Sequence, residues 1–500
     1  MSRLQQLKNR LAVIADVNGA ASLLGWDQQI YMPAGGAAAR AEQLATLGRL
    51  SHEMLTVSEI GELLEGAAAE VAGQPDAADA VCLIRVVRRD YDRARKVPPD
   101  LVAEIARATS LGMEIWVQAW KASNYSQFRP AFQRILDLHK DLARCLGFDE
   151  SPYDPLLDQY EPGIKKSELV KIFADVKAGL VPLVQAISER LDRVDDAILR
   201  QKYAEQAQWD FGLEVARHVG YDFNRGRQDK SVHPFTTSFS INDVRITTRT
   251  DEQFLPTALF GTLHECGHAL YEQGISQSLE RTPLASGASL GIHESQSRLW
   301  ENLVGRSRGF WKFFYPRLQQ IFPANLAAVA QEQFYRAINR VEPSLIRVEA
   351  DEVTYNLHIL LRFELEGDLI EGRLDLADLP QAWNAKMTEY LGVVPTDDAL
   401  GVLQDVHWSN GLIGYFPTYS LGNLISVQLF EKAQSANPSF DSQVEAGDFL
   451  SLLAWLRENI HRHGRKFLPS DLVKRASGDP LQAGPYLGYL RNKYAEIYQL

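Results

Sequence analysis

The residues most able to do chemistry form one short run, His264-Glu265-Cys266-Gly267-His268, which matches the pattern H-E-x-x-H. Residues four apart on a helix lie on one face, so the two imidazoles can share one Zn²⁺ ion. Glu265 lies one residue further round and can reach a water on that ion without being a ligand. The spacing therefore predicts a water-activating zinc site with His264 and His268 as ligands and Glu265 as general base.

A catalytic zinc needs a third protein ligand and one open position. Glu294 is the best candidate, because it follows His268 after one loop, at the start of a further predicted helix. The competing interpretation of Glu294 is an acid stabilised by the helix dipole. Three other acids are rival ligands: Glu272, Glu280 and Glu301.

The segment before the motif differs from the rest of the chain. Residues 231–250 are rich in Thr, Val, Ile and Phe and alternate roughly in polarity, which predicts a hairpin or small sheet. The motif itself has leucines at spacings of four and seven, which predicts a helix. An edge strand beside a zinc helix can pair with the backbone of a peptide substrate.

Hydrolysis also needs a donor for the developing oxyanion. His407, Tyr415 and Tyr419 are candidates, because a neutral imidazole or a phenol can bind that oxygen. The alternative for each of them is ordinary aromatic packing.

An arginine offers a way to recognise a peptide end. Arg347 and Asp351 are four residues apart on a long helix predicted from Pro343 to about Gly372. Asp351 could hold Arg347 in place to bind a carboxylate through two parallel hydrogen bonds. Otherwise the two form a weak surface ion pair. Arg245, in the predicted strand segment, is the competing clamp.

Composition limits the class of protein. The 500 residues carry a net charge of -12, which argues against nucleic acid or an anionic membrane as partner. There is neither a long apolar run nor an apolar signal region at the N-terminus, so we expect no membrane association. Only three cysteines are present, which favours a reducing compartment and a cytoplasmic location.

Several short motifs together resemble one family, the M32 metallocarboxypeptidases of the carboxypeptidase Taq type. The matching pieces are His233-Pro-Phe, Asp243-Val-Arg-Ile-Thr-Thr, His264-Glu-Cys-Gly-His, His293-Glu-Ser-Gln, Ile346-Arg-Val-Glu-Ala-Asp and Gly401-Val-Leu-Gln-Asp-Val-His-Trp. The resemblance extends from about residue 20 to the C-terminus. Short motifs are weak singly, but six in the same order are specific.

The resemblance implies a mainly α, saddle-like fold with a deep central groove and one small β-sheet or hairpin near the active site. It implies one peptidase unit over 1–500 with two helical lobes, an N-terminal helical part at about 1–150 and a catalytic region at about 225–425. It also implies a homodimer, which composition cannot show.

The resemblance also assigns residues. It puts the metal ligands on His264, His268 and Glu294, and the catalytic glutamate, the general base, on Glu265. Further positions fall on substrate or transition-state contacts: Arg347, His407, and Tyr415 or Tyr419. Arg245 and His233, which lie in the matching motifs, are further candidates for substrate binding. Many peptidases with a Glu third ligand have an Asp one turn later, but position 298 is Arg, so Asp243 is the candidate partner of the zinc histidines.

The function we expect is zinc-dependent release of single C-terminal amino acids from peptides with broad preference. One Zn²⁺ per chain would serve, and Co²⁺ or Mn²⁺ could occupy the same site. One alternative is an oligopeptidase that cuts internal bonds of short peptides. Another, from a different class, is a non-catalytic helical peptide-binding protein.

Overall fold

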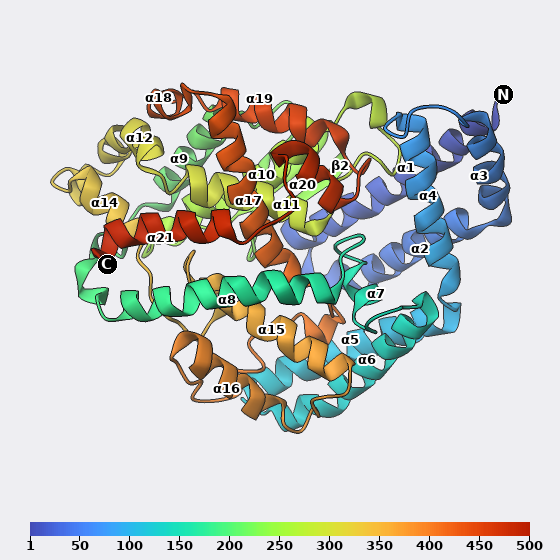
Figure 1. Ribbon diagram of the computed structural model, residues 1–500, viewed down its shortest axis with the longest axis horizontal. Helices are drawn as coiled ribbons and strands as arrows, with labels where there is room; N and C mark the ends of the chain where they lie inside the picture. The colour runs from blue at the N-terminus through green and yellow to red at the C-terminus, as the bar shows by residue number, and fades with distance from the viewer. The chain divides into compact units, whose positions relative to one another are not determined.

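The computed structural model describes all 500 residues, and most of them lie in helices (Figure 1). The chain forms two compact units, each built from three separate segments. Unit 1 comprises residues 1–95, 196–338 and 429–480, and unit 2 comprises residues 96–195, 339–428 and 481–500. The predicted mainly α class with one small sheet is confirmed.

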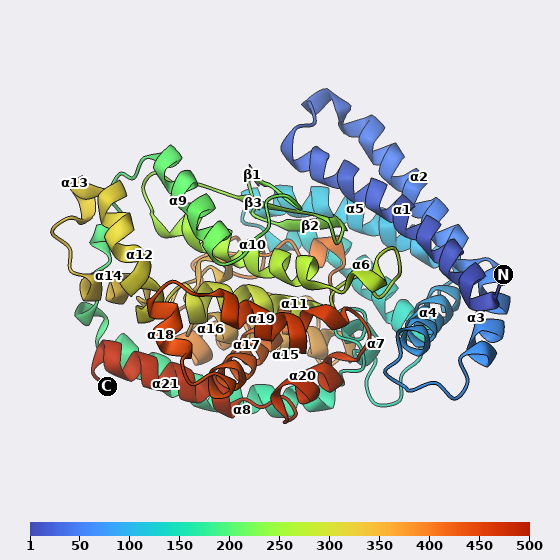
Figure 2. The same cartoon turned by 90° about the horizontal axis from the view of Figure 1, so that it is seen from above.

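Unit 1 contains the only sheet and most of the helices. Its helices are α1 (Arg3–Ile30), α2 (Ala37–Thr56), α3 (Ser58–Glu70), α4 (Asp79–Lys96), α9 (Glu205–His218), α10 (Pro256–Gly274), α11 (Leu290–Arg298), α12 (Arg308–Ile321), α13 (Pro323–Leu326), α14 (Gln331–Ile338), α18 (Phe440–Glu445), α19 (Leu450–Asn459) and α20 (Pro469–Ser477). A π-helical segment, Leu299–Val304, directly follows α11. Figure 2 shows α1 and α2 as an antiparallel pair.

Unit 2 is helical throughout. Its helices are α5 (Pro99–Lys121), α6 (Tyr125–Leu146), α7 (Asp154–Leu157), α8 (Lys166–Ser188), α15 (Tyr355–Ile370), α16 (Leu379–Leu391) and α21 (Gly484–Tyr498). Helix α17 (Pro417–Ala436) begins in unit 2 and ends in unit 1. Helices α5 and α6 lie side by side, and α8 packs against α15, α16 and α21.

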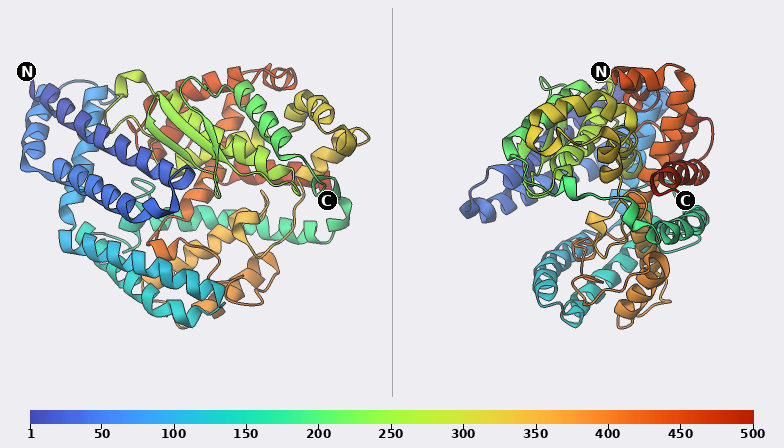
Figure 3. Two further views of the ribbon diagram at one scale, coloured as in Figure 1. Left: turned by 180° about the vertical axis from the view of Figure 1, so that it is seen from behind. Right: turned by 90° about the vertical axis from the view of Figure 1, so that its left-hand side faces the viewer.

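The sheet is small and lies against α10 (Figure 3, left). It consists of β1 (Gln228–Lys230), β2 (Thr236–Ser240) and β3 (Asp243–Thr248), in the order β1-β3-β2. The pair β2 and β3 is antiparallel, with Thr236 opposite Ile246, so the predicted hairpin is confirmed. The sequence did not predict β1, which pairs with β3 in parallel and makes β2 an edge strand.

Helix α10 is buried on nearly all sides, as its apolar composition suggests. Pro256 occupies its first turn, where the missing N–H costs nothing. At Gly267, a Cβ atom would come within 2.5 Å of Gln296 O and of Ser297 Cα on α11. Only glycine allows α10 and α11 to cross this closely, and the crossing brings Glu294 to the two histidines.

The long helix predicted from Pro343 to Gly372 is wrong in its first third. Helix α15 begins only at Tyr355, and Arg347 lies in a short 3₁₀ turn before it. Asp351 accepts hydrogen bonds from the backbone N–H groups of Val353 and Thr354 and from the Thr354 hydroxyl. These bonds hold Asp351 in the turn that precedes α15.

Candidate metal centre and polar clusters

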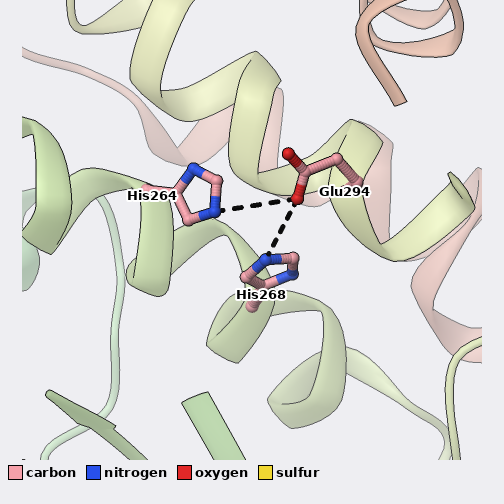
Figure 4. A group of neighbouring side chains, drawn as sticks. All are labelled: His264, His268 and Glu294. Atoms are coloured by element: carbon pink, nitrogen blue, oxygen red, sulfur yellow. Dashed lines mark ion pairs between the residues drawn. The ribbon is translucent and has the colours of Figure 1, made fainter. Parts of the chain in front are cut away.

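The two histidines of α10 and Glu294 of α11 point toward one another (Figure 4). Glu294 Oε2 lies 3.7 Å from His264 Nε2 and 3.5 Å from His268 Nε2. One donor atom from each residue can be chosen so that all lie within 4.8 Å of one another. Donors at about 2.1 Å from a tetrahedral ion are about 3.4 Å apart, so the three residues fit a divalent metal ion.

Each imidazole has a partner on the side away from Glu294. His264 Nδ1 lies 3.0 Å from Glu301 Oε2. His268 Nδ1 lies 2.6 Å from His293 Nδ1, and His293 Nε2 lies 2.7 Å from Glu272 Oε1. Such partners fix the tautomer and orientation of metal-binding histidines, leaving the Nε2 atoms to the metal.

These contacts correct two sequence-based hypotheses. Glu272 and Glu301, the rival ligands, are acceptors behind the imidazoles, and Glu280 accepts the backbone N–H of Ile241 instead. Asp243 does not partner a zinc histidine but pairs with Arg245. Helical spacing was the sequence signal that could have pointed to these two acceptors. Glu272 is one turn after His268, and Glu301 is two turns after Glu294.

Arg298, one turn after Glu294, contacts both Glu294 and Glu301. Its Nε donates to Glu294 Oε1 at 2.7 Å, and its Nη1 donates to Glu301 Oε2 at 3.2 Å. Burial by itself would raise the pKa of both carboxyl groups, but Arg298 and His264 hold both values well below their usual range. Both acids therefore stay ionised, as a metal ligand and an acceptor for an imidazole must.

Glu265 lies on α10 between the two histidines, and its side chain is bonded to the edge strand. It is 5% exposed, and Thr236 Oγ1 of β2 lies 2.6 Å from its Oε2. Burial raises the pKa of Glu265, although His264 and the Thr236 hydroxyl act in the opposite direction. A buried carboxyl with a raised pKa is a better proton acceptor at neutral pH than an exposed one.

Arg347 belongs to a polar cluster in unit 2. Its Nε lies 2.9 Å and its Nη2 lies 2.8 Å from Asp405 Oδ1, and its Nη1 donates to the Tyr355 hydroxyl at 2.9 Å. The acid that orients Arg347 is therefore Asp405, and the proposed Arg347–Asp351 pair is wrong. Asp405 lies far from Arg347 in the sequence, so helical spacing could not have predicted this contact.

His407, Tyr415 and Tyr419 come together in the same unit. His407 Nε2 lies 3.1 Å from the Tyr419 hydroxyl, and the Tyr419 ring centroid lies 5.2 Å from Arg347 Cζ. Tyr415 packs edge-on against Tyr160 and His407. Burial lowers the pKa of His407 to about 4, so this imidazole is neutral at pH 7.

Arg245 and His233 lie in unit 1 and have other surroundings. Arg245 forms two hydrogen bonds of 2.9 Å with Asp243, and its guanidinium lies over the rings of Trp26 and Phe239 at 4.4 and 4.8 Å. Its charge is already matched by an acid on the same strand. His233 is exposed, in the loop between β1 and β2.

Comparisons with known proteins give matches over nearly the whole chain. A family model described as carboxypeptidase Taq (M32) metallopeptidase matches residues 6–494. The chain is 46% identical over 486 residues to thermostable carboxypeptidase 1 of Thermus thermophilus, covering 95% of each chain. It is 37% identical over 487 residues to carboxypeptidase 1 of Bacillus subtilis, covering 97% of each.

The crystal structure of an M32 carboxypeptidase from Deinococcus radiodurans superimposes with a TM-score of 0.96 at 42% identity, over all of both chains. The chain therefore belongs to the carboxypeptidase Taq (M32) family of metallopeptidases. It is a metallocarboxypeptidase, as the motifs predicted. The structure contains no helix with the length and hydrophobicity that a membrane span requires.

Proposed function

We propose that the enzyme holds one Zn²⁺ ion between His264, His268 and Glu294 and releases single C-terminal residues from peptides with broad preference. The observation that carries the proposal is the convergence of the three donor atoms, with both Nδ1 atoms already paired behind them. Two imidazoles and a carboxylate suit zinc, and they would also accept Co²⁺ or Mn²⁺.

The protein's own groups would do the proton transfer. A bound Zn²⁺ would polarise the scissile carbonyl and make water more acidic. Glu265 would take a proton from the attacking water and pass it to the leaving amine, while the Thr236 hydroxyl keeps its carboxylate in place. His407 would orient the Tyr419 hydroxyl as a donor to the developing oxyanion, with Tyr415 as the alternative donor.

Arg347 would bind the terminal carboxylate of the peptide. Its contacts with Asp405 and Tyr355 involve one N–H on each of its three nitrogens. One further N–H remains on each terminal nitrogen, and these two groups can donate to the oxygens of a carboxylate. A group that recognises the chain end would limit the enzyme to exopeptidase activity.

A peptide ladder tests the reaction. The metal-loaded enzyme should shorten a free peptide one residue at a time from its C-terminus, as followed by mass spectrometry. A peptide blocked at both ends should stay intact. Internal cleavage of the blocked peptide would favour the oligopeptidase alternative, and activity that survives metal removal by a chelator would contradict the metal mechanism.

Arg347→Ala tests the carboxylate contact. Truncating one partner of a buried charge pair costs about 2–5 kcal/mol. We therefore expect kcat/KM on free-acid peptides to fall by roughly 30- to 3,000-fold, at about 1.4 kcal/mol per decade. The loss on C-terminally amidated peptides should be much smaller. Arg245→Ala is the matched control, and equal losses on acid and amide for Arg347→Ala would make this arginine structural.

Two further properties complete the proposal: a dimer, which rests on the family resemblance, and a cytoplasmic location, which rests on the cysteine content. We propose that the enzyme is a cytoplasmic homodimer, and its three free cysteines are consistent with a reducing compartment. Light scattering of the purified protein would give the mass, and a monomer at micromolar concentration would contradict the dimer.

A further inference from the structure

Arg347 shares its acid with a second arginine. Asp405 Oδ1 faces Arg347, whereas Asp405 Oδ2 lies 2.6 Å from Arg362 Nε and 2.5 Å from Arg362 Nη2. The three side chains are buried, with exposed fractions of 6% for Arg347, 8% for Asp405 and 0% for Arg362. Two guanidinium groups therefore share one carboxylate, and all three side chains are shielded from water.

The remaining polar partners of Arg362 are neutral. Its Nη1 donates to the backbone carbonyl of His358 at 2.6 Å, and its Nη2 donates to Gln404 Oε1 at 2.8 Å. Burial lowers the pKa of Arg362 to about 10, with Asp405 opposing and Arg347 reinforcing this shift. Arg362 is therefore still charged at pH 7, and the three bonded side chains together carry one net positive charge.

The other titratable groups nearby do not cancel this charge through a direct contact. His407 Nδ1 lies 3.9 Å from Asp405 Oδ1, and burial lowers the pKa of both His407 and His358, so neither is charged at pH 7. Glu366 lies one turn after Arg362 on α15. Its carboxylate accepts from other groups, namely Tyr153, Trp408 Nε1 and the Gly414 N–H.

A buried unit of net charge is unfavourable unless a partner of opposite charge joins it. If Asp405 served Arg347 alone, the pair would be neutral and would attract an anion weakly. Because Arg347 and Arg362 share Asp405, the three side chains keep one uncompensated positive charge, which would attract an incoming carboxylate to Arg347. Arg362 itself is fully buried and its nitrogens are occupied by protein groups, so it would act without touching the substrate.

We propose that Arg362 is a positioning residue that sets the preference of the enzyme for a free C-terminal carboxylate, by sharing Asp405 so that Arg347 retains net positive charge. The inference rests on the proposed role of Arg347 as the carboxylate contact. The ligand class is a monoanionic carboxylate at the end of a peptide or of an acylated amino acid.

Competitive inhibition by a matched pair of ligands tests the proposal. N-acetyl-phenylalanine and its amide differ only in the terminal charge, and the ratio of their inhibition constants measures the preference for an anion. In Arg362→Met we expect this preference to fall about tenfold or more, and in Arg362→Lys, which keeps the charge, we expect most of it to remain. Equal weakening of both ligands in Arg362→Met would make Arg362 merely structural and overturn the proposal.

Two variants keep the test decisive. If Arg362→Met does not fold, Asp405→Asn reverses the sign of the change, because it leaves both arginines charged. The preference for the acid should then be held or raised, and a fall would show that orientation by Asp405 matters rather than the charge excess. Arg347→Ala separates the hypotheses: a loss there but not in Arg362→Met overturns only the role of Arg362, and no loss in Arg347→Ala overturns both.

Discussion

Replacing Glu301 by alanine removes the acceptor behind one metal-binding imidazole. Glu301 Oε2 lies 3.0 Å from His264 Nδ1 and holds the ring with Nε2 toward Glu294. Loss of such a partner costs about 10- to 100-fold in metal affinity, or roughly 1.4–2.7 kcal/mol. We expect the upper part of this range, because the Glu301 side chain is only 13% exposed and little water can replace it.

Glu301→Gln separates geometry from charge. Its amide oxygen can still accept from His264, so only the difference between a charged and a neutral hydrogen bond is lost, about 1 kcal/mol. The metal dissociation constant should therefore rise about fivefold in Glu301→Gln, between the wild-type value and that of Glu301→Ala.

Competition with a chromophoric zinc chelator measures all three constants, and circular dichroism checks that the metal-free variants are folded. Glu280→Ala is the matched control, because Glu280 bonds the backbone of Ile241 and no imidazole. If Glu301→Ala binds zinc within about twofold of wild type, or if Glu280→Ala loses as much affinity, the reasoning about the imidazole acceptor is refuted.

Three further predictions concern single acids. Glu265→Gln should keep one metal per chain but lower kcat by about 10²–10⁴-fold, and turnover near the wild-type rate would exclude Glu265 as the base. Glu294→Ala should hold well below one metal per chain by elemental analysis; stoichiometric metal there, with loss in Glu272→Ala, would assign the third ligand to Glu272. Burial raises the pKa of Glu366 from 4.5 to about 7, so the folded chain keeps a proton that the unfolded chain releases, and this group makes stability fall as pH rises from 4.5 to 7. Relative to wild type, Glu366→Gln should gain up to about 3 kcal/mol in free energy of unfolding between pH 5 and pH 8, as measured by urea denaturation, and the opposite trend would contradict this assignment.

The sequence by itself determined the features that depend on local spacing. His264 and His268 share a face of α10 because a helix repeats every 3.6 residues. The β2–β3 hairpin followed from alternating β-branched residues. A set of ordered motifs was enough for the family and for the activity class, because each motif preserves a local arrangement of chemically active side chains.

Only the tertiary structure decided which side chains meet across distant segments. The acceptors behind the imidazoles are Glu301 and the His293–Glu272 pair, which the crossing of α10 and α11 brings together at Gly267. Arg347 is held by Asp405 rather than by Asp351, whose side chain bonds the backbone at the start of α15. Spacing along the chain cannot predict such contacts, because hydrogen-bond partners of buried charges are selected by the packing of whole elements and by the cost of leaving a charge unpaired.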